Sequence, residues 1–186
     1  MIRRTYLAGI VAALALAAIA QPQPARAATA KAIDTNVDEA LRTLYASNPT
    51  AKALGEQAKA VLVFPLVLKG GFIIGGQWGD GALRQDGKTV GYYRTIAGSI
   101  GLQAGVQSFG YALFLMTEGA LDYLKSSNGW EIGVGPTVTV LDKGAAASLS
   151  TTTAKSDVYA ITFDQKGLMA GISVEGAKVS PITPEA

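Results

Sequence analysis

The chain contains no histidine and no cysteine, so the side chains that most often act as bases, nucleophiles and metal ligands are missing. The lack of cysteine excludes disulfides, thiol nucleophiles and zinc fingers. The lack of histidine excludes a Ser-His-Asp triad and an imidazole base. We therefore expect a protein that is not an enzyme and that uses no metal and no cofactor.

Carboxylates are the remaining candidates for catalysis, because a glycosidase uses two of them that face each other about 5–10 Å apart. Nothing in their spacing places such a pair together, and solvated charge is the commoner role of these residues. A carboxylate hydrolase is kept as an alternative hypothesis. Its candidate residues are Asp80, Glu118, Asp122 and Glu131.

A phosphate-binding loop is a second alternative, since Gly87-Lys88-Thr89 matches the end of such a motif. The motif needs four residues between its two glycines, whereas five separate Gly81 from Gly87. Asp86-Gly87 is instead typical of a two-residue β-hairpin turn. The sequence therefore predicts a hairpin here and no nucleotide site.

Two short segments combine a cation with an aromatic side chain, a composition that favours contact with anionic lipid headgroups. Lys69 lies three residues before Phe72, and Arg94 directly follows Tyr93. We predict that Lys69 and Arg94 contact a headgroup while Phe72 and Tyr93 insert beside it. The other basic residues are scattered along the chain, and so we expect no nucleic acid partner.

The first 27 residues have the three parts of a signal peptide. Arg3-Arg4 is a basic start, 7–20 is an uncharged and mostly apolar run, and Ala25-Arg26-Ala27 is a typical cleavage site. An uncleaved membrane anchor is the alternative, but the run is short for a spanning helix. The twin arginines also resemble a twin-arginine export signal. We expect a single domain over 28–186, periplasmic or secreted, and peripheral on a membrane.

Export changes the charge of the protein. The full chain has 16 Lys and Arg residues against 14 Asp and Glu residues. Removal of Arg3, Arg4 and Arg26 leaves 13 against 14, a net charge of −1. Attraction to an anionic membrane would therefore depend on where a few Lys and Arg side chains lie, and not on a global positive field.

Three helices are predicted from capping residues and from the helical spacing of apolar side chains. They run from about Val37 to Ala46, from Pro49 to about Ala60, and from Thr117 to Ser126. Proline suits the first position of the second helix. A threonine cap begins the third helix, and Asn128-Gly129 ends it.

Glycine is dense between Gly70 and Gly135, with 16 glycines in 66 residues. Each costs a helix roughly 1 kcal/mol relative to alanine, so the region favours strands, bulges and tight turns. The predicted strands are 61–64 (which Pro65 closes), 81–84, 89–93, 130–141, 158–163 and 168–174, with a turn at 164–167, a loop at 144–153 and an unstructured tail at 181–186. The fold class expected is α+β, a mostly antiparallel, glycine-rich β-sheet or partial barrel with two N-terminal helices and one internal helix.

Three motifs, in order along the chain, resemble the signature of the SYLF lipid-binding domain family. The opening signature comprises Val61–Pro65, Lys69–Gly76 and Gly79–Gly81; the central motif is Ser99–Gly105 with Gln107; and the closing motif is Gly167–Gly176. Together they cover about Leu41 to Val179. Where the family commonly has a Trp-Ser-x-Pro-like segment before the central motif, this chain has Tyr92-Tyr93-Arg94-Thr95.

The resemblance implies a non-enzymatic domain that binds membranes, with phosphoinositides as ligands of eukaryotic members, some of which also bind actin. Combined with the export signal, it predicts a protein of a bacterial-type envelope that contacts anionic phospholipid headgroups at a membrane surface. The alternative is a structural or interaction protein of the envelope that self-associates or docks a protein partner through its glycine-rich strands.

Overall fold

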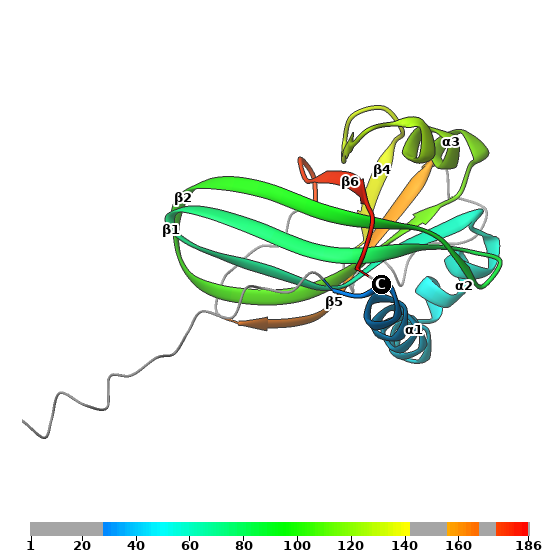
Figure 1. Ribbon diagram of the computed structural model, residues 1–186, viewed down its shortest axis with the longest axis horizontal. Helices are drawn as coiled ribbons and strands as arrows, with labels where there is room; N and C mark the ends of the chain where they lie inside the picture. The colour runs from blue at the N-terminus through cyan, green and yellow to red at the C-terminus, as the bar shows by residue number, and fades with distance from the viewer. Residues whose placement is uncertain (1–27, 142–155, 168–173, 186) are drawn as a thin grey trace, which may run out of the picture.

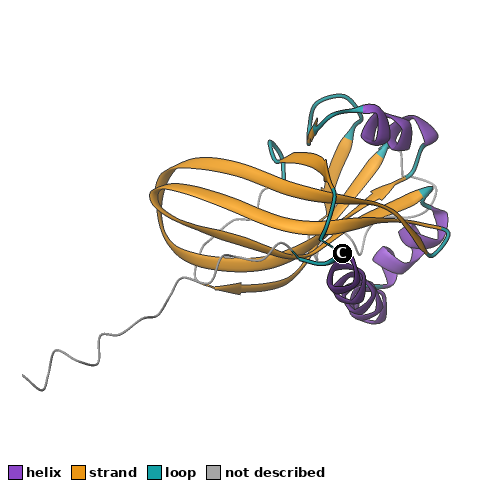
Figure 2. Ribbon diagram, in the orientation of Figure 1, coloured by secondary structure: helices purple, strands orange, loops and turns teal. Residues whose placement is uncertain are grey.

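The computed structural model describes residues 28–141, 156–167 and 174–185 of the 186-residue chain. The signal peptide predicted at 1–27, the loop predicted at 144–153 and most of the strand predicted at 168–174 lie outside the described residues. The described residues form three helices and one curled sheet (Figures 1 and 2), which confirms the α+β prediction.

Two helices open the described part, as the capping residues predicted. Helix α1 spans Ala30–Ser47, and its cap is Thr29, whose hydroxyl accepts a hydrogen bond from the backbone N–H of Ala32. It begins earlier than predicted, because this cap precedes the predicted one. Helix α2 spans Pro49–Gln57, and the Asn48 side chain caps it.

Strands β1 (Ala60–Gln85) and β2 (Lys88–Leu115) form one long antiparallel hairpin. Its turn is the predicted Asp86-Gly87 pair, with φ angles of 51° and 74°. Both angles are positive, as a type I′ turn requires. The hairpin prediction is confirmed, but each strand is far longer than the segments predicted from the sequence.

The hairpin folds back on itself, so β1 has an outgoing half (60–71) and a returning half (75–85), joined at a bend (Figure 1). The two halves touch where the returning half has no side chain. A Cβ on Gly79 would lie 2.6 Å from the carbonyl oxygen of Leu66, and one on Gly81 would overlap the carbonyl oxygen of Val63. Glycine is therefore required there for the close approach of the two halves.

Strand β2 accompanies β1 around this bend and carries the remaining strands on its other edge. Strand β6 (Lys178–Ile182) pairs with its first part and β5 (Val158–Gly167) with its second. Strand β3 (Trp130–Glu131) then pairs with β6, and β4 (Val138–Leu141) lies parallel to β5. The described ends of the chain meet, since Ala30 donates a backbone hydrogen bond to Glu185.

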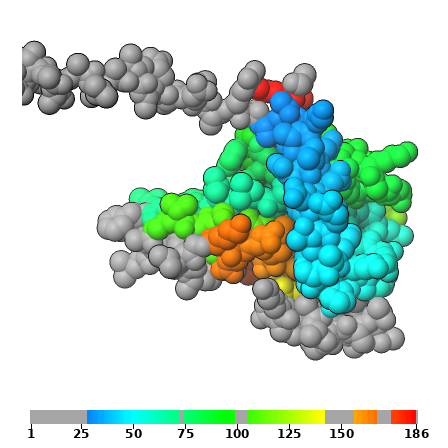
Figure 3. All heavy atoms as spheres, turned by 90° about the horizontal axis from the view of Figure 1, so that it is seen from below, coloured from blue at the N-terminus to red at the C-terminus, as the bar shows by residue number. Residues whose placement is uncertain are grey.

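The curled sheet has a hydrophobic core on each face. The inner, concave face packs with helix α3 (Glu118–Ser126) around Phe64, Tyr111 and Trp130. The outer face packs against α1 and α2, which bury Val61, Ala82 and Phe114 among other side chains. The helices cover only part of the outer face, and green strand segments extend beyond them in the space-filling view (Figure 3).

Several predicted boundaries are wrong. Pro65 does not end a strand, because it lies in a register shift between Phe64 and Val67, where a proline does not interrupt the ladder. The turn predicted at 164–167 is part of β5, with Asp164 at a φ of 50°. The tail predicted as unstructured includes the end of β6. Only the two ends of the strand predicted at 130–141 are strands.

Candidate functional site

The outer face near the bend exposes large apolar side chains. Trp78 and Ile96 are direct cross-strand partners, and their side chains are 45% and 52% exposed. Their chain neighbours Gln77, Thr95 and Ala97 face inward, so strand alternation turns Trp78 and Ile96 outward. The same alternation exposes further side chains in the outgoing half of the hairpin.

We call this surface the outer apolar face. It has two sides that meet at the bend: Leu66, Leu68 and Val106 lie on the side of the outgoing half, and Ile74, Trp78 and Ile96 lie on the side of the returning half. The two residues nearest the bend are the most exposed, Ile74 at 70% and Val106 at 71%. An exposed apolar surface of this kind marks a site of contact with a membrane or a partner.

A lysine lies at the same level on each side of this face. Lys166 of β5 is aligned with Ser108, which in turn pairs with Leu68. Lys178 of β6 pairs with Ile96, which pairs with Trp78. Both lysines are exposed, and with the described residues neither forms an ion pair within 4.0 Å. Neither ammonium group is held by a carboxylate of these residues, although Glu131 is a direct cross-strand partner of Lys178.

Arg94, one of the predicted headgroup contacts, is already engaged. Its guanidinium donates two hydrogen bonds to the carboxylate of Asp80, at 2.6 and 2.9 Å, and stacks over the Trp78 ring at 5.3 Å from the ring centre. The hydrogen bonds to Asp80 raise the pKa of Arg94. Because Asp80 neutralises it, Arg94 supports the position of Trp78 more than it supplies free positive charge.

Tyr93 and Lys69, two of the other predicted site residues, do not lie on one surface with Arg94. Tyr93 is 6% exposed and belongs to the inner core, where burial raises its pKa; this position argues against insertion of its ring into lipid. Lys69 is half-buried and follows the inward-facing Val67 by two residues, so it faces the interior. Phe72 pairs with Ala104, and its side chain lies outside the described ones.

Trp78, Ile96 and the two lysines are not among the site residues predicted from the sequence. Trp78 precedes Asp80 by two residues and therefore shares its side of the strand, a signal that was present in the sequence. The lysines had no such signal. Lys178 reaches this face through pairing of β6 with β2, which the sequence did not predict.

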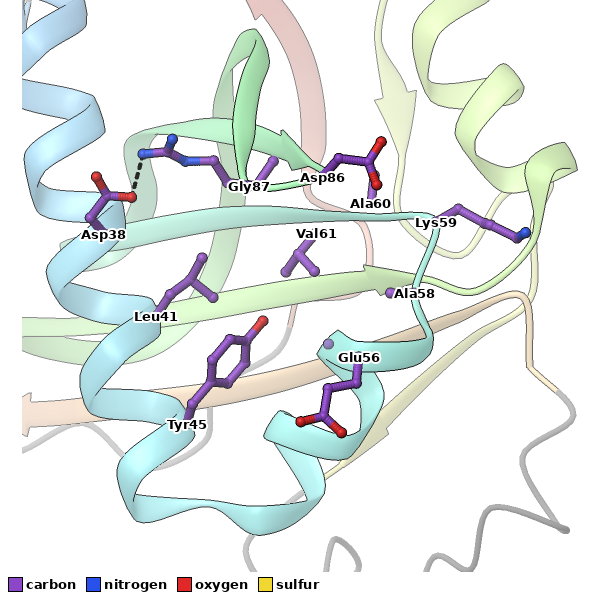
Figure 4. Close-up of a pocket in the computed structure, with 12 residues that line it drawn as sticks. Asp38, Leu41, Tyr45, Glu56, Ala58, Lys59, Ala60, Val61, Asp86 and Gly87 are labelled. Atoms are coloured by element: carbon purple, nitrogen blue, oxygen red, sulfur yellow. Dashed lines mark hydrogen bonds and ion pairs between the residues drawn. The ribbon is translucent and has the colours of Figure 1, made fainter.

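A separate pocket of about 320 Å³ lies between α1, α2, β1 and the hairpin turn (Figure 4). Its walls carry the carboxylates of Asp38, Glu56 and Asp86 against only Lys59 and Arg84. Arg84 is already bound, because it donates a hydrogen bond of 2.6 Å to Asp38. The excess of acidic groups makes this pocket a poor site for an anion.

The four candidate catalytic carboxylates do not form a facing pair. Asp80 binds Arg94, Glu118 is 3.4 Å from the ammonium of Lys59, and Glu131 lies on β3 opposite Lys178. Asp122 is exposed on α3, one turn after Glu118 on the same helix. Two carboxylates on one helix face do not enclose a substrate from opposite sides.

Within the described ranges, no helix is long and apolar enough to span a membrane. The same residues contain no group of three or more acidic side chains placed to hold a metal ion.

Comparison with known proteins gives one family. Residues 96–184 match the family model Ysc84, described as Las17-binding protein actin regulator. The matched range contains the central and closing motifs, whereas the opening signature precedes it. No curated protein matches the chain. The match confirms the predicted resemblance to the Ysc84, or SYLF, family over residues 96–184.

Proposed function

We propose that this protein is an exported, non-enzymatic protein that binds anionic phospholipid membranes through the bend of its long hairpin. The observation that carries the proposal is the outer apolar face with a lysine at either side. Transfer of apolar side chains from water into lipid lowers the free energy of the system. Each lysine near a charged bilayer adds about 1 kcal/mol of attraction.

The side chains of the outer apolar face that lie nearest the bend are the most exposed, which supports an orientation in which the bend enters the membrane first. Ile74 and Val106, nearest the bend, would enter the lipid first. Trp78 lies further from the bend, in the region where tryptophan prefers the boundary between headgroups and acyl chains. Lys166 and Lys178 align with residues of this second level, so their ammonium groups would lie among the headgroups.

Export and lipid preference are parts of the same proposal. The signal peptide predicted at 1–27 supports a periplasmic or secreted location. The expected ligands are anionic lipids such as phosphatidylglycerol and cardiolipin, with phosphoinositides as the class that the family resemblance suggests. Contact with an actin-like or other protein partner, which the family description suggests, is the alternative function.

Vesicle binding tests the proposal directly. The purified protein is mixed with phosphatidylglycerol, cardiolipin, phosphoinositide or neutral phosphatidylcholine vesicles at low salt, and the co-sedimenting fraction is measured. Binding to anionic vesicles alone is expected. The absence of binding to every anionic vesicle, together with concentration-dependent oligomers, would contradict the proposal and favour the interaction protein.

Tryptophan fluorescence identifies the contacting surface in the same experiment. The chain has two tryptophans, and Trp130 is 2% exposed whereas Trp78 is half-exposed. Entry of Trp78 into lipid should shift its emission to shorter wavelength, and Trp78→Phe should abolish the shift while binding persists. Persistence of the shift in Trp78→Phe would place the contact elsewhere.

A further inference from the structure

The interior of the hairpin is polar close to the bend, which is the reverse of its outer face. Lys69, Gln77 and Gln107 all face inward here, and the two glutamines are only 5% and 1% exposed. The apolar side chains of the same strand segments point outward, among them Leu68 and Trp78. Buried polar groups normally have partners, so this reversal needs a physical explanation.

The strand register brings the three polar residues to one place. Lys69 and Gln107 are direct cross-strand partners, whose side chains leave the sheet on the same side. Gly79 lies against Val67 where the two halves of β1 touch, so the positions two residues nearer the bend, Gln77 and Lys69, lie opposite each other.

Their hydrogen-bonding groups are unused. Among the described residues, Nε2 of Gln77 and both Nε2 and Oε1 of Gln107 have no partner. Lys69 likewise forms no ion pair within 4.0 Å there. By contrast, the neighbouring inner hydroxyls are satisfied, since Tyr111 donates a hydrogen bond of 2.6 Å to Thr95. The cluster is therefore polar and buried and lacks hydrogen-bond partners in the described part of the chain, whereas the neighbouring Tyr111 and Thr95 hydroxyls bind each other.

The two halves of β1 also touch on the bend side of the cluster, because a Cβ on Gly71 would overlap the backbone of Gly75. Gly105, the partner of Gly71, carries no side chain, and the side chain of Ser99, the partner of Gly75, lies outside the described ones. Lys69 is only half-buried, so its amine also has access to solvent. A small polar ligand could therefore reach the amides alongside the Lys69 side chain.

We propose that Lys69, Gln77 and Gln107 bind the phosphate group of a phosphate ester, such as a phospholipid headgroup. The ammonium supplies positive charge, the amide nitrogens supply hydrogen-bond donors for phosphate oxygens, and Oε1 of Gln107 accepts from a ligand hydroxyl. This inference rests on the proposed function, because Lys69 lies beside Leu68, at the level where headgroups would meet the inserted hairpin. It also returns Lys69 to the ligand contact predicted from the sequence, now from the inner side.

The test uses soluble probes, so that it does not depend on insertion into a bilayer. The full chain is titrated calorimetrically with glycerol 3-phosphate and with dihexanoyl phosphatidylglycerol below its micelle concentration. Lys69→Gln and Gln107→Leu should each weaken binding at least about tenfold, and Gln107→Glu should abolish it through repulsion of the phosphate. Lys88→Gln, an exposed lysine at the hairpin turn, is the matched control and should have no effect.

The two probes distinguish the source of the phosphate. Binding of both, with the short-chain lipid tighter, supports a headgroup site; binding of glycerol 3-phosphate alone supports a site for free phosphate esters. Wild-type protein that binds neither probe, or Gln107→Leu and Lys69→Gln variants that bind normally, would overturn the inference and leave ordered water as the partner of the amides.

Vesicle co-sedimentation of the same variants separates this inference from the proposed function. If wild type binds anionic vesicles and these substitutions have no effect on that binding, the inner site is rejected while membrane binding stands. Lys69→Gln changes a half-buried side chain and keeps the test valid if a Gln107 variant fails to fold.

Discussion

The guanidinium of Arg94 holds the carboxylate of Asp80, its direct cross-strand partner, through two hydrogen bonds of 2.6 and 2.9 Å. The Asp80 side chain is 7% exposed, whereas that of Arg94 is 31% exposed. Removal of the arginine would leave a nearly buried carboxylate without its counterion. The pair therefore contributes to the stability of the sheet beneath the outer apolar face.

We predict that Arg94→Gln lowers the free energy of unfolding by about 1–3 kcal/mol, because Asp80 loses a charged hydrogen-bond donor and solvent screens only part of the loss. Urea denaturation measures the change. Lys178→Gln, on the same face but without a described ion pair, is the control and should stay within about 0.5 kcal/mol of wild type. Equal stability of the two variants would show that the Asp80–Arg94 pair contributes nothing.

The flanking lysines should determine the affinity for charged vesicles. Lys166→Gln and Lys178→Gln are each expected to weaken binding to phosphatidylglycerol vesicles about fivefold, from roughly 1 kcal/mol per lysine. The double variant should also bind with a weaker dependence on salt, because fewer charges interact with the surface. Co-sedimentation across a salt series measures both effects. A Lys88→Gln variant that loses as much affinity would indicate a diffuse attraction without a defined contact.

The residues nearest the bend should contribute through apolar burial. Ile74→Ser and Val106→Ser remove side chains that are about 70% exposed, so folding stability should change little. Vesicle binding should weaken by roughly 1 kcal/mol each, or about fivefold. Val90→Ser is the matched control, because Val90 is also exposed but lies near the hairpin turn at the other end. If Val90→Ser weakens binding as much as the other two, the bend does not enter the membrane.

The sequence predicted those elements that depend only on residues close together in the chain, such as helix caps and tight turns. Thr117 caps α3 as expected, and Asp86-Gly87 forms the hairpin turn. It also predicted the family from three motifs. The fold-back of the hairpin was missed, because the requirement for glycine at Gly79 and Gly81 comes from backbone carbonyls more than ten residues away in the chain. Composition shows that glycine is abundant but not which backbone segment it approaches.

The orientation of the site residues likewise depends on strand pairing, which the sequence does not show. The turn pairs Gln85 with Lys88, and an uninterrupted ladder from that pair would place Asp80 opposite Tyr93. The register shift between Leu83 and Arg84 instead places Asp80 opposite Arg94 and turns Tyr93 inward. A shift by one residue exchanges the two faces of a strand. Sequence alone therefore could not say which of Tyr92 and Tyr93 faces the inner core.

The close contact between the two halves of β1 gives a prediction for folding stability. Gly81→Ala places a methyl group against the carbonyl oxygen of Val63 and should destabilise the protein by about 1–3 kcal/mol. Gly98→Ala, at a strand position with no atom within 4 Å of the new Cβ, should be neutral or stabilising by up to about 1 kcal/mol. Thermal unfolding compares the two. A Gly81→Ala protein as stable as Gly98→Ala would mean that the halves are not in contact in solution.

Asp157 should make folding stability depend on pH. Its carboxylate accepts hydrogen bonds from the backbone N–H and the hydroxyl of Thr137, at 3.0 and 2.8 Å, and one from Thr117, the cap of α3. The hydrogen bonds from Thr137 hold the pKa of Asp157 below its ordinary value. Since the pKa in the unfolded chain is about 3.9, this stabilisation is complete well above pH 4 and is lost as the pH falls through the lower folded value.

Asp157→Asn removes the titrating group while nearly conserving the shape of the side chain. We expect the variant to be less stable than wild type at pH 7, and the difference between the two to shrink as the pH falls from about 5 to 2. Urea denaturation at several pH values measures this difference, which cancels the titration of all other carboxylates. Glu175→Gln, an exposed carboxylate on a turn, is the control and should show no such trend. A constant difference between Asp157→Asn and wild type at every pH would mean that shape, and not charge, accounts for the role of Asp157 at the junction of α3, β4 and β5.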